Sequence, residues 1–239
     1  IIKYKIISHR SLVNLGHWLI LKALRLKLPI KWLVKPIVYD VFCGGENLLE
    51  CRPIIKQLKE NRISTCLHYA MEGDGDSQRA LHIIEQTVRT LKFQYSFKQK
   101  SFNVLKVSGL ISSDILQSIQ ERTSSTESRR AFTELTNRLE GLCQTAVEFG
   151  TSFMIDAEES WIQKPIDDLT VSLMKKFNKE KAVIYITLQM YRRDRWEYLQ
   201  SLVEMSIKEN FILGIKLVRG AYLEKERSWA NKVGRRCVV

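Results

Sequence analysis

Four polar side chains recur near the ends of apolar segments that have the length and composition of β-strands: Lys106, Asp156, Gln189 and Lys216. In each segment, polar and apolar side chains alternate, so the two kinds point to opposite faces of the strand. The carboxyl ends of neighbouring parallel strands meet at one edge of the sheet. The alternation therefore predicts that these four side chains meet in one central space, where βα barrels bind their ligands.

The charges in this group indicate what it could bind. The lysines favour an anionic ligand, and Asp156 can orient or neutralise a lysine on a neighbouring strand. Gln189 can both donate and accept hydrogen bonds, as recognition of the edge of a heteroaromatic ring requires. A flavin and a phosphosugar both satisfy these demands, so the residue types leave both open. The sequence contains no GxGxxG, P-loop, HExxH or nucleophile-elbow motif, so those chemistries have no support.

The segment Phe211–Tyr222, FILGIKLVRGAY, has the clearest strand pattern. Its apolar face, which includes Leu213 and Leu217, is predicted to pack under helices, while Lys216 points to the opposite face. Gly220 has no Cβ, so the backbone there can come close to a phosphate or a ring system. The alternative is that Lys216 belongs to an edge strand and keeps an exposed sheet soluble.

Strand and helix patterns alternate along the chain from residue 64 onward. The predicted strands are Ser64–Glu72, Phe102–Leu110, Ser152–Glu158, Ala182–Met190 and Ile212–Gly220. The predicted helices are Ser77–Leu91, Asp114–Gln120, Ala131–Phe149, Ile166–Phe177 and Trp196–Lys208, and the polar stretch Glu121–Arg130 is predicted as a loop. This alternation is typical of a parallel sheet with helices outside it, so the predicted fold class is α/β.

The N-terminal segment is unusually basic. The formal net charge of the chain is +12, and only basic charged residues precede the first acid, Asp40. Leucines such as Leu15 and Leu19 lie among these charges, which predicts basic amphipathic helices. These helices either cap the main domain or bind an anionic membrane surface. No basic motif is interleaved with aromatic residues, so no nucleic-acid partner is predicted.

The remaining composition is that of an ordinary globular protein of 239 residues. The five cysteines form no CxxC pair, which favours free thiols in a reducing compartment, and no metal site is predicted. No run of 18 apolar residues occurs, so a membrane-spanning segment is not predicted. The chain starts at Ile1 rather than Met, which leaves room for a targeting peptide upstream.

Several short motifs follow one another in a specific order. They are FCGGE at Phe42–Glu46, LHYAMEG at Leu67–Gly73, KVSGL at Lys106–Leu110, FMIDAEE at Phe153–Glu159, LQMY at Leu188–Tyr191 and KLVRGAYLEKER at Lys216–Arg227. In order and spacing they resemble proline dehydrogenase in its eukaryotic mitochondrial form. The resemblance implies a distorted (βα)8 TIM-type barrel that holds FAD. It also implies oxidation of L-proline to 1-pyrroline-5-carboxylate, with electrons passing to quinone, on the matrix face of the mitochondrial inner membrane.

The resemblance also implies roles for individual residues. Lys106 would bind the substrate carboxylate, and Asp156 would hold that lysine in place. Gln189 would contact the flavin ring. The residues that would line the flavin and its phosphates are Lys216, Val218, Gly220, Ala221 and Tyr222.

The sequence departs from the family's pattern at His68, where an aspartate is usual, and at Leu188, where an aromatic residue is usual. The resemblance ends after about Trp229. We therefore divide the chain into a basic helical segment (1–41), a partial FAD-binding βα barrel (42–229) and a divergent tail (230–239).

Two expectations follow from the limits of the resemblance. About five strands cannot close an eight-stranded barrel, so the last strand is expected to have an open edge, and the 239-residue chain is expected not to oxidise proline by itself. Two alternatives to proline oxidation are hydroxyproline dehydrogenase, which shares these motifs, and a truncated non-catalytic relative that binds a membrane or a partner.

Overall fold

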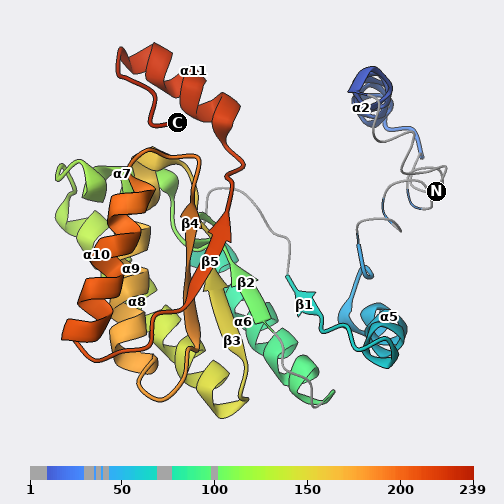
Figure 1. Cartoon of the computed structure of the whole chain (residues 1–239). Helices are drawn as coiled ribbons and strands as arrows, with labels where there is room; N and C mark the ends of the chain where they lie inside the picture. The colour runs from blue at the N-terminus through green and yellow to red at the C-terminus, as the bar shows by residue number, and fades with distance from the viewer. Residues whose placement is uncertain (1–9, 30–34, 36–38, 40–42, 69–76, 98–101) are drawn as a thin grey trace. The chain divides into compact units, whose positions relative to one another are not determined.

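The structure is a computed structural model that describes residues 10–29, 35, 39, 43–68, 77–97 and 102–239. The chain divides into two compact units, Ile1–Ile63 and Ser64–Val239. Figure 1 shows the elements of both units, and each unit is described here by itself.

The first unit contains helices α2 (Arg10–Arg25) and α5 (Leu48–Glu60). In α2, Leu15, Trp18 and Leu19 are exposed, in line with the predicted amphipathic helix. The Asn47 side chain accepts a hydrogen bond from the Glu50 N–H (3.1 Å) and so caps the N-terminus of α5. No helix in the described parts of the chain is long and apolar enough to cross a membrane.

The second unit is built on a parallel five-stranded sheet with the strand order β1-β2-β3-β4-β5. Its strands are β1 (Cys66–Leu67), β2 (Phe102–Leu105), β3 (Ser152–Ile155), β4 (Ile184–Gln189) and β5 (Ile215–Val218). Their sequential order and parallel direction agree with the prediction of an α/β fold built from repeated βα units.

Helices follow the strands along the chain. They are α6 (Ser77–Tyr95), α7 (Ser113–Gln120), α8 (Thr126–Glu148), α9 (Ser160–Phe177), α10 (Arg195–Lys208) and α11 (Leu223–Val233). Figure 1 shows α8, α9 and α10 along one face of the sheet, with α11 beyond the carboxyl end of β5. The hydrophobic core lies between the sheet and these helices and includes Phe153, Ile184 and Leu188. The sheet's other face carries apolar side chains such as Val104 and Met154 along the strands and polar side chains at their carboxyl ends.

Within the described residues every strand is shorter than predicted, and the reason is clearest after β2; residues 69–72 of the first predicted strand lie outside the described part of the chain. The predicted strand Phe102–Leu110 ends at Leu105, and the chain then forms the 3-10 turn η2 (Val107–Gly109). The N–H of Leu110 donates to the carbonyl of Val107 (2.9 Å), which closes this turn. The strand pairs of β2 end at Leu105, so Lys106 begins the turn instead of continuing the strand.

Two helices begin several residues earlier than predicted. α8 begins at Thr126, inside the predicted loop, because the Ser125 side chain accepts a hydrogen bond from the Ser128 N–H (3.1 Å) and caps the helix. α9 begins at Ser160, with Pro165 inside it, although the prediction began at Ile166. Contacts from α11 hold this first turn, and a sequence pattern cannot reveal contacts between distant segments.

The apolar face predicted for the last strand is not covered by helices along its whole length. Leu217 is 60% exposed, whereas Leu213 and Ile215 are partly buried. β5 is the edge strand of the described sheet, so Leu217 has a neighbour on one side only.

Candidate active site

A pocket of about 420 Å³ opens at the carboxyl ends of β2 to β5. Its lining contains every site residue predicted from the sequence: Lys106, Asp156, Gln189, Lys216, Val218, Gly220, Ala221 and Tyr222. Ala157, Thr187 and Arg219 line it too, and the sequence analysis did not place them in the site. The phase of β4 could have identified Thr187, because it lies two residues before Gln189 on the same face.

The strand register explains why these side chains meet. Leu105 pairs with Ile155, Ile155 with Ile186, and Ile186 with Ile215. The next position along each strand therefore forms a row across the sheet, which consists of Lys106, Asp156, Thr187 and Lys216. Because neighbouring side chains alternate between faces, the whole row lies opposite the core.

The row contains an ion pair that the sequence analysis did not name. The resemblance implied that Asp156 holds Lys106, and in the structure the carboxylate of Asp156 accepts from the Nζ of Lys216 at 2.5 Å. Asp156 and Lys216 lie two strands apart, on either side of β4. The long side chain of Lys216 spans the width of β4 above the small side chain of Thr187, which explains how it reaches Asp156.

Thr187 is the unusual member of the row. Its side chain is 4% exposed, and its Oγ1 has no hydrogen-bond partner among the described residues. A buried hydroxyl without a partner costs free energy, so its position in a polar pocket indicates a place for a ligand atom.

Gln189 is 2% exposed, and both ends of its amide are bonded. Its Nε2 donates to the backbone carbonyl of Glu158 (2.7 Å), and its Oε1 accepts from the Tyr191 hydroxyl (3.2 Å). These contacts fix the orientation of the amide at the wall of the pocket.

Glu158 lies behind the pocket and connects β2 with β3. Its carboxylate accepts from the N–H of Ser108 (2.9 Å) and from the Ser108 hydroxyl. Burial raises the pKa of Glu158, and the two contacts with Ser108 oppose that shift. In the sequence analysis Glu158 is the last residue of a predicted strand and has no role.

Lys106 and Tyr222 face each other across the pocket. Burial raises the pKa of the Tyr222 hydroxyl to about 12, and the positive charge of Lys106 opposes this rise. Tyr222 is also the N-cap residue directly before α11, so the position of this helix determines where the phenol lies.

The close approach predicted at Gly220 is made by the protein's own side chain. The φ angle of Gly220 is 127°, which disfavours any residue with a Cβ. A Cβ at this position would lie 1.4 Å from Cε1 of Tyr191. Gly220 therefore lets the Tyr191 ring pack against the turn and reach Gln189 with its hydroxyl.

The two departures from the family's pattern lie in different surroundings. The ring Nδ1 of His68 lies 2.9 Å from the carbonyl of Val104, and the side chain is exposed. Leu188 is fully buried in the core on the other face of β4, so its substitution changes the packing of the core and not the pocket lining.

Comparison with known proteins agrees with this geometry. The family model for proline dehydrogenase matches residues 51–239. The chain belongs to the proline dehydrogenase family. The match includes residues 230–239, where the sequence motifs gave no resemblance.

Relatives in this family include both named enzymes and a biosynthesis protein. Proline dehydrogenase 1, mitochondrial, from Dictyostelium discoideum is 28% identical over 249 residues, which cover 87% of this chain and 44% of that protein. The carbapenem antibiotics biosynthesis protein CarD of Pectobacterium carotovorum subsp. carotovorum is 33% identical over 192 residues, covering 80% and 51%. The chain thus spans about half the length of these relatives.

Solved structures of proline utilization A (PutA) share the fold. PutA from Bdellovibrio bacteriovorus, inactivated by N-propargylglycine, superimposes with a TM-score of 0.73 at 20% identity over 84% of this chain and 22% of that chain. The proline dehydrogenase domains of such proteins are TIM-type barrels, so the parallel sheet described here belongs to that architecture.

Proposed function

We propose that the protein oxidises L-proline to 1-pyrroline-5-carboxylate with FAD as its cofactor and passes the electrons to quinone. The observation that carries this proposal is the row of Lys106, Asp156, Thr187 and Lys216, which meets Gln189 in one pocket. Membership of the proline dehydrogenase family supports the substrate, and its relatives named as mitochondrial support a location at the matrix face of the inner membrane.

The residues of the pocket fit a flavin. Thr187 has a buried hydroxyl without a partner among the described residues, and Gln189 presents an oriented amide beside it. Both suit the polar edge of a heteroaromatic ring. Lys216 and Arg219 supply positive charge near the Gly220 turn, which suits an anionic group. FAD, when bound, would supply the redox chemistry by accepting a hydride from the substrate.

The protein's own residues would bind and orient the substrate. We assign the substrate carboxylate to Lys106, whose ammonium group lines the pocket near Tyr222. Asp156 would hold Lys216 in place beside the flavin. Val218, Ala221 and the Gly220 turn would line the cofactor, and catalysis would come mainly from positioning.

We also propose a peripheral association with an anionic membrane surface. The supporting observation is that α2 exposes leucines and Trp18 beside Lys22 and Arg25. Apolar side chains flanked by basic ones are typical of helices that lie at a membrane surface.

The central proposal is tested on the chain completed with the remaining barrel strands and last helix of a relative, beside the 239-residue chain itself, by loading FAD and following proline-dependent bleaching of the flavin without oxygen. Lys106→Met should lower kcat/KM by roughly 100-fold, because a charged contact with the substrate is lost. Lys164→Met is the matched control, since Lys164 is exposed and does not line this pocket. Hydroxyproline, assayed in parallel, decides between the two substrates. A protein that binds no FAD, or a Lys106→Met variant with the wild-type rate, would refute the proposal.

A further inference from the structure

A buried chain of polar contacts extends from Gln189 away from the pocket into α9. The Nε2 of Gln189 donates to the carbonyl of Glu158 (2.7 Å), and the N–H of Glu158 donates to Oε1 of Gln163 (2.6 Å). The Nε2 of Gln163 then donates to Oδ1 of Asp167 (2.7 Å). Gln163 is 3% exposed and Asp167 is 3% exposed, so the contacts are shielded from water.

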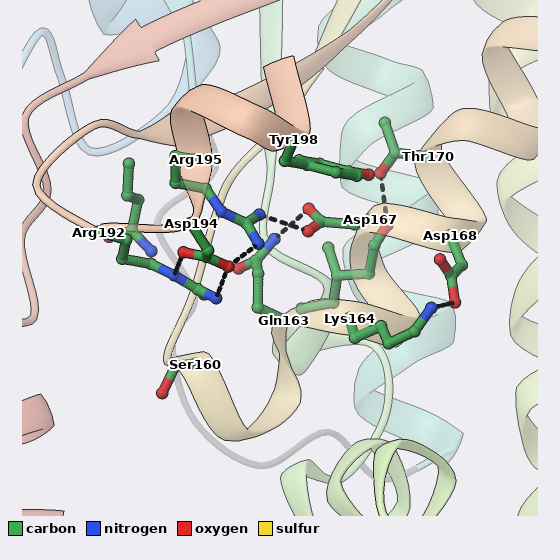
Figure 2. Close-up of polar contacts among 12 residues, drawn as sticks. Ser160, Gln163, Lys164, Asp167, Asp168, Thr170, Arg192, Asp194, Arg195 and Tyr198 are labelled. Carbon is green, nitrogen blue, oxygen red and sulfur yellow. Dashed lines mark hydrogen bonds and ion pairs between the residues drawn. The ribbon is translucent and has the colours of Figure 1, made fainter. Parts of the chain in front are cut away.

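An ion network closes this chain into a ring, and Figure 2 shows the part of it that runs from Gln163 through Asp167, Arg195 and Asp194 to Arg192. Nη1 of Arg195 donates to Oδ2 of Asp167 (2.7 Å), and Nη2 donates to Asp194 (2.5 Å). Arg192 binds the same carboxylate of Asp194 through Nε (3.0 Å) and Nη2 (2.8 Å). The backbone N–H of Arg192 donates to the carbonyl of Gln189 (3.0 Å). Gln189 is therefore held by its side chain at one end of the ring and by its backbone at the other.

The groups next to each amide in the ring allow only one orientation of that amide. An ionised Asp167 only accepts hydrogen bonds, so Gln163 must turn its nitrogen toward Asp167 and its oxygen toward the Glu158 N–H. The carbonyl of Glu158 also only accepts, so Gln189 must turn its nitrogen toward it. The Gln189 oxygen is then left to face the Tyr191 hydroxyl and the pocket.

Asp167 and Arg195 act at a distance from the pocket. They line a separate cavity of about 320 Å³ and do not line the pocket at the strand ends. Arg195 is 8% exposed and also stacks on the ring of Tyr198, with 4.6 Å between its guanidinium carbon and the ring centroid. A buried guanidinium favours the ionised form of its carboxylate partner, which the orientation of Gln163 requires.

We propose that Asp167 and Arg195 are positioning residues for Gln189: their ion pair holds Gln163 and the Glu158 peptide in place, and so sets where the Gln189 amide lies in the wall of the pocket. This inference rests on the proposed function, in which that amide contacts the flavin. It adds residues on α9 and α10 that touch neither the substrate nor the cofactor.

The first test is Asp167→Asn in the FAD-loaded protein. An asparagine has no charge to hold the Arg195 guanidinium, so the contact between α9 and α10 weakens and Gln163 and the Glu158 peptide lose support. We expect the flavin absorbance band to shift in the same direction as in Gln189→Ala, and the Kd for FAD to rise roughly tenfold. Asp168→Asn is the matched control, since Asp168 is next in α9 and forms an exposed pair with Lys164 (2.6 Å). It should change neither value.

A second variant separates positioning from a loss of folding. Gln163→Met interrupts the ring but keeps the Asp167–Arg195 pair. We expect this variant to melt near the wild-type temperature and to show the same flavin shift as Asp167→Asn. Unchanged spectra and FAD affinity in Gln163→Met would overturn this inference, even if Asp167→Asn unfolds. If the wild-type protein bound no FAD, both this inference and the proposed function would fail. If the wild-type protein bound FAD and the variants showed the same FAD affinity and spectrum as the wild type, only this inference would be refuted.

Discussion

Thr187 is the residue at which the pocket shows most directly that a ligand is needed. Its buried hydroxyl has no partner among the described residues, although Asp156 and Lys216 in the same row bond each other. The unpaired hydroxyl therefore lowers the free energy of unfolding of the ligand-free protein.

Thr187→Val tests this interpretation by separating stability from binding. The variant removes the unpaired hydroxyl, so we expect the ligand-free protein to become more stable by about 1 kcal/mol, while FAD binds more weakly. Thr170→Val is the control, because the Thr170 hydroxyl is equally buried but donates to the Ile166 carbonyl (2.7 Å). Thermal melting with and without FAD measures both effects. A loss of stability in both variants would show that Thr187 has a partner in the folded protein.

Gly220 gives a second prediction at the scale of one residue. In Gly220→Ala the new Cβ would overlap the Tyr191 ring at a positive φ, so we expect a loss of stability on the order of 3 kcal/mol. Gly150→Ala is the control, since Gly150 also has a positive φ (61°) but its added Cβ would meet no atom within 4 Å. It should cost about 1 kcal/mol. Equal losses in denaturant unfolding would mean that the Tyr191 ring moves away freely.

At the scale of elements, α11 is held against the first turn of α9. The carboxylate of Glu226, 1% exposed, accepts from the N–H (2.7 Å) and the hydroxyl (2.6 Å) of Ser160. The rings of Trp161 and Trp229 stack beside this contact, with 5.0 Å between centroids. Tyr222 is the N-cap residue of α11 and lines the pocket, so the contacts that hold α11 also position this part of the pocket wall.

Glu226→Ala should therefore release α11 from α9. We expect a loss of about 2 kcal/mol, because two hydrogen bonds to a buried carboxylate disappear and the Ser160 N–H loses its partner. Amide hydrogen exchange should become faster in Leu223–Val233 than in α10. Arg227→Ala, at the exposed next position, should leave exchange unchanged. Protection of α11 in Glu226→Ala would show that the tryptophan pair suffices to hold it.

The helix α2 supports a prediction about membranes. The purified protein should bind vesicles that contain anionic lipid more tightly than neutral vesicles, and added salt should weaken this binding. Replacing Lys22 and Arg25, the basic residues of its last turn, with glutamate should reduce binding to anionic vesicles. Co-sedimentation measures the bound fraction. Equal affinity for both kinds of lipid would favour the alternative that α2 packs on another protein surface.

At the scale of the whole molecule, buried acids link stability to pH. Burial raises the pKa of Glu158 above its ordinary value of 4.5. Below that value both folded and unfolded chains are protonated, and stability is unaffected. As the pH rises toward the folded-state pKa, the unfolded chain ionises first, so this group lowers stability, and the loss remains at higher pH. Asp167 acts in the same direction, because burial raises its pKa also.

Glu158→Gln removes this titration while it retains a side chain of the same shape. The melting temperature of the wild-type protein, relative to the variant, should fall as the pH rises from about 4.5 to 8. A wild-type protein that gains stability over Glu158→Gln with rising pH would contradict the assignment.

Asp194 gives the opposite sign in a lower pH range. Burial alone would raise the pKa of Asp194, but hydrogen bonds and charges from Arg195 and Arg192 outweigh it and lower the pKa to about 2. The contribution of Asp194 to stability is therefore present above its ordinary value of 3.8 and is lost as the pH falls through the lowered one.

Much of the fold and some of the pocket residues were predictable because they depend on local patterns. Alternation along each strand placed Lys106, Asp156, Gln189 and Lys216 on one face, and parallel strands then bring one face of every strand to one edge. The βα order of the elements follows from the same periodicities. Element ends were less accurate, because caps such as Ser125 and contacts such as Glu226 with Ser160 compete with periodicity.

Only the tertiary structure decided which of these side chains interact. Asp156 pairs with Lys216 because a long side chain can reach across β4, and no spacing in the sequence encodes that distance. Gly220 accommodates the Tyr191 ring, since the turn after β5 lies beside the turn after β4. The ring from Gln189 to Asp167 and Arg195 joins three elements through single hydrogen bonds. Such contacts form only when residues far apart in the sequence come within a few ångströms of each other in space, and only folding brings them that close.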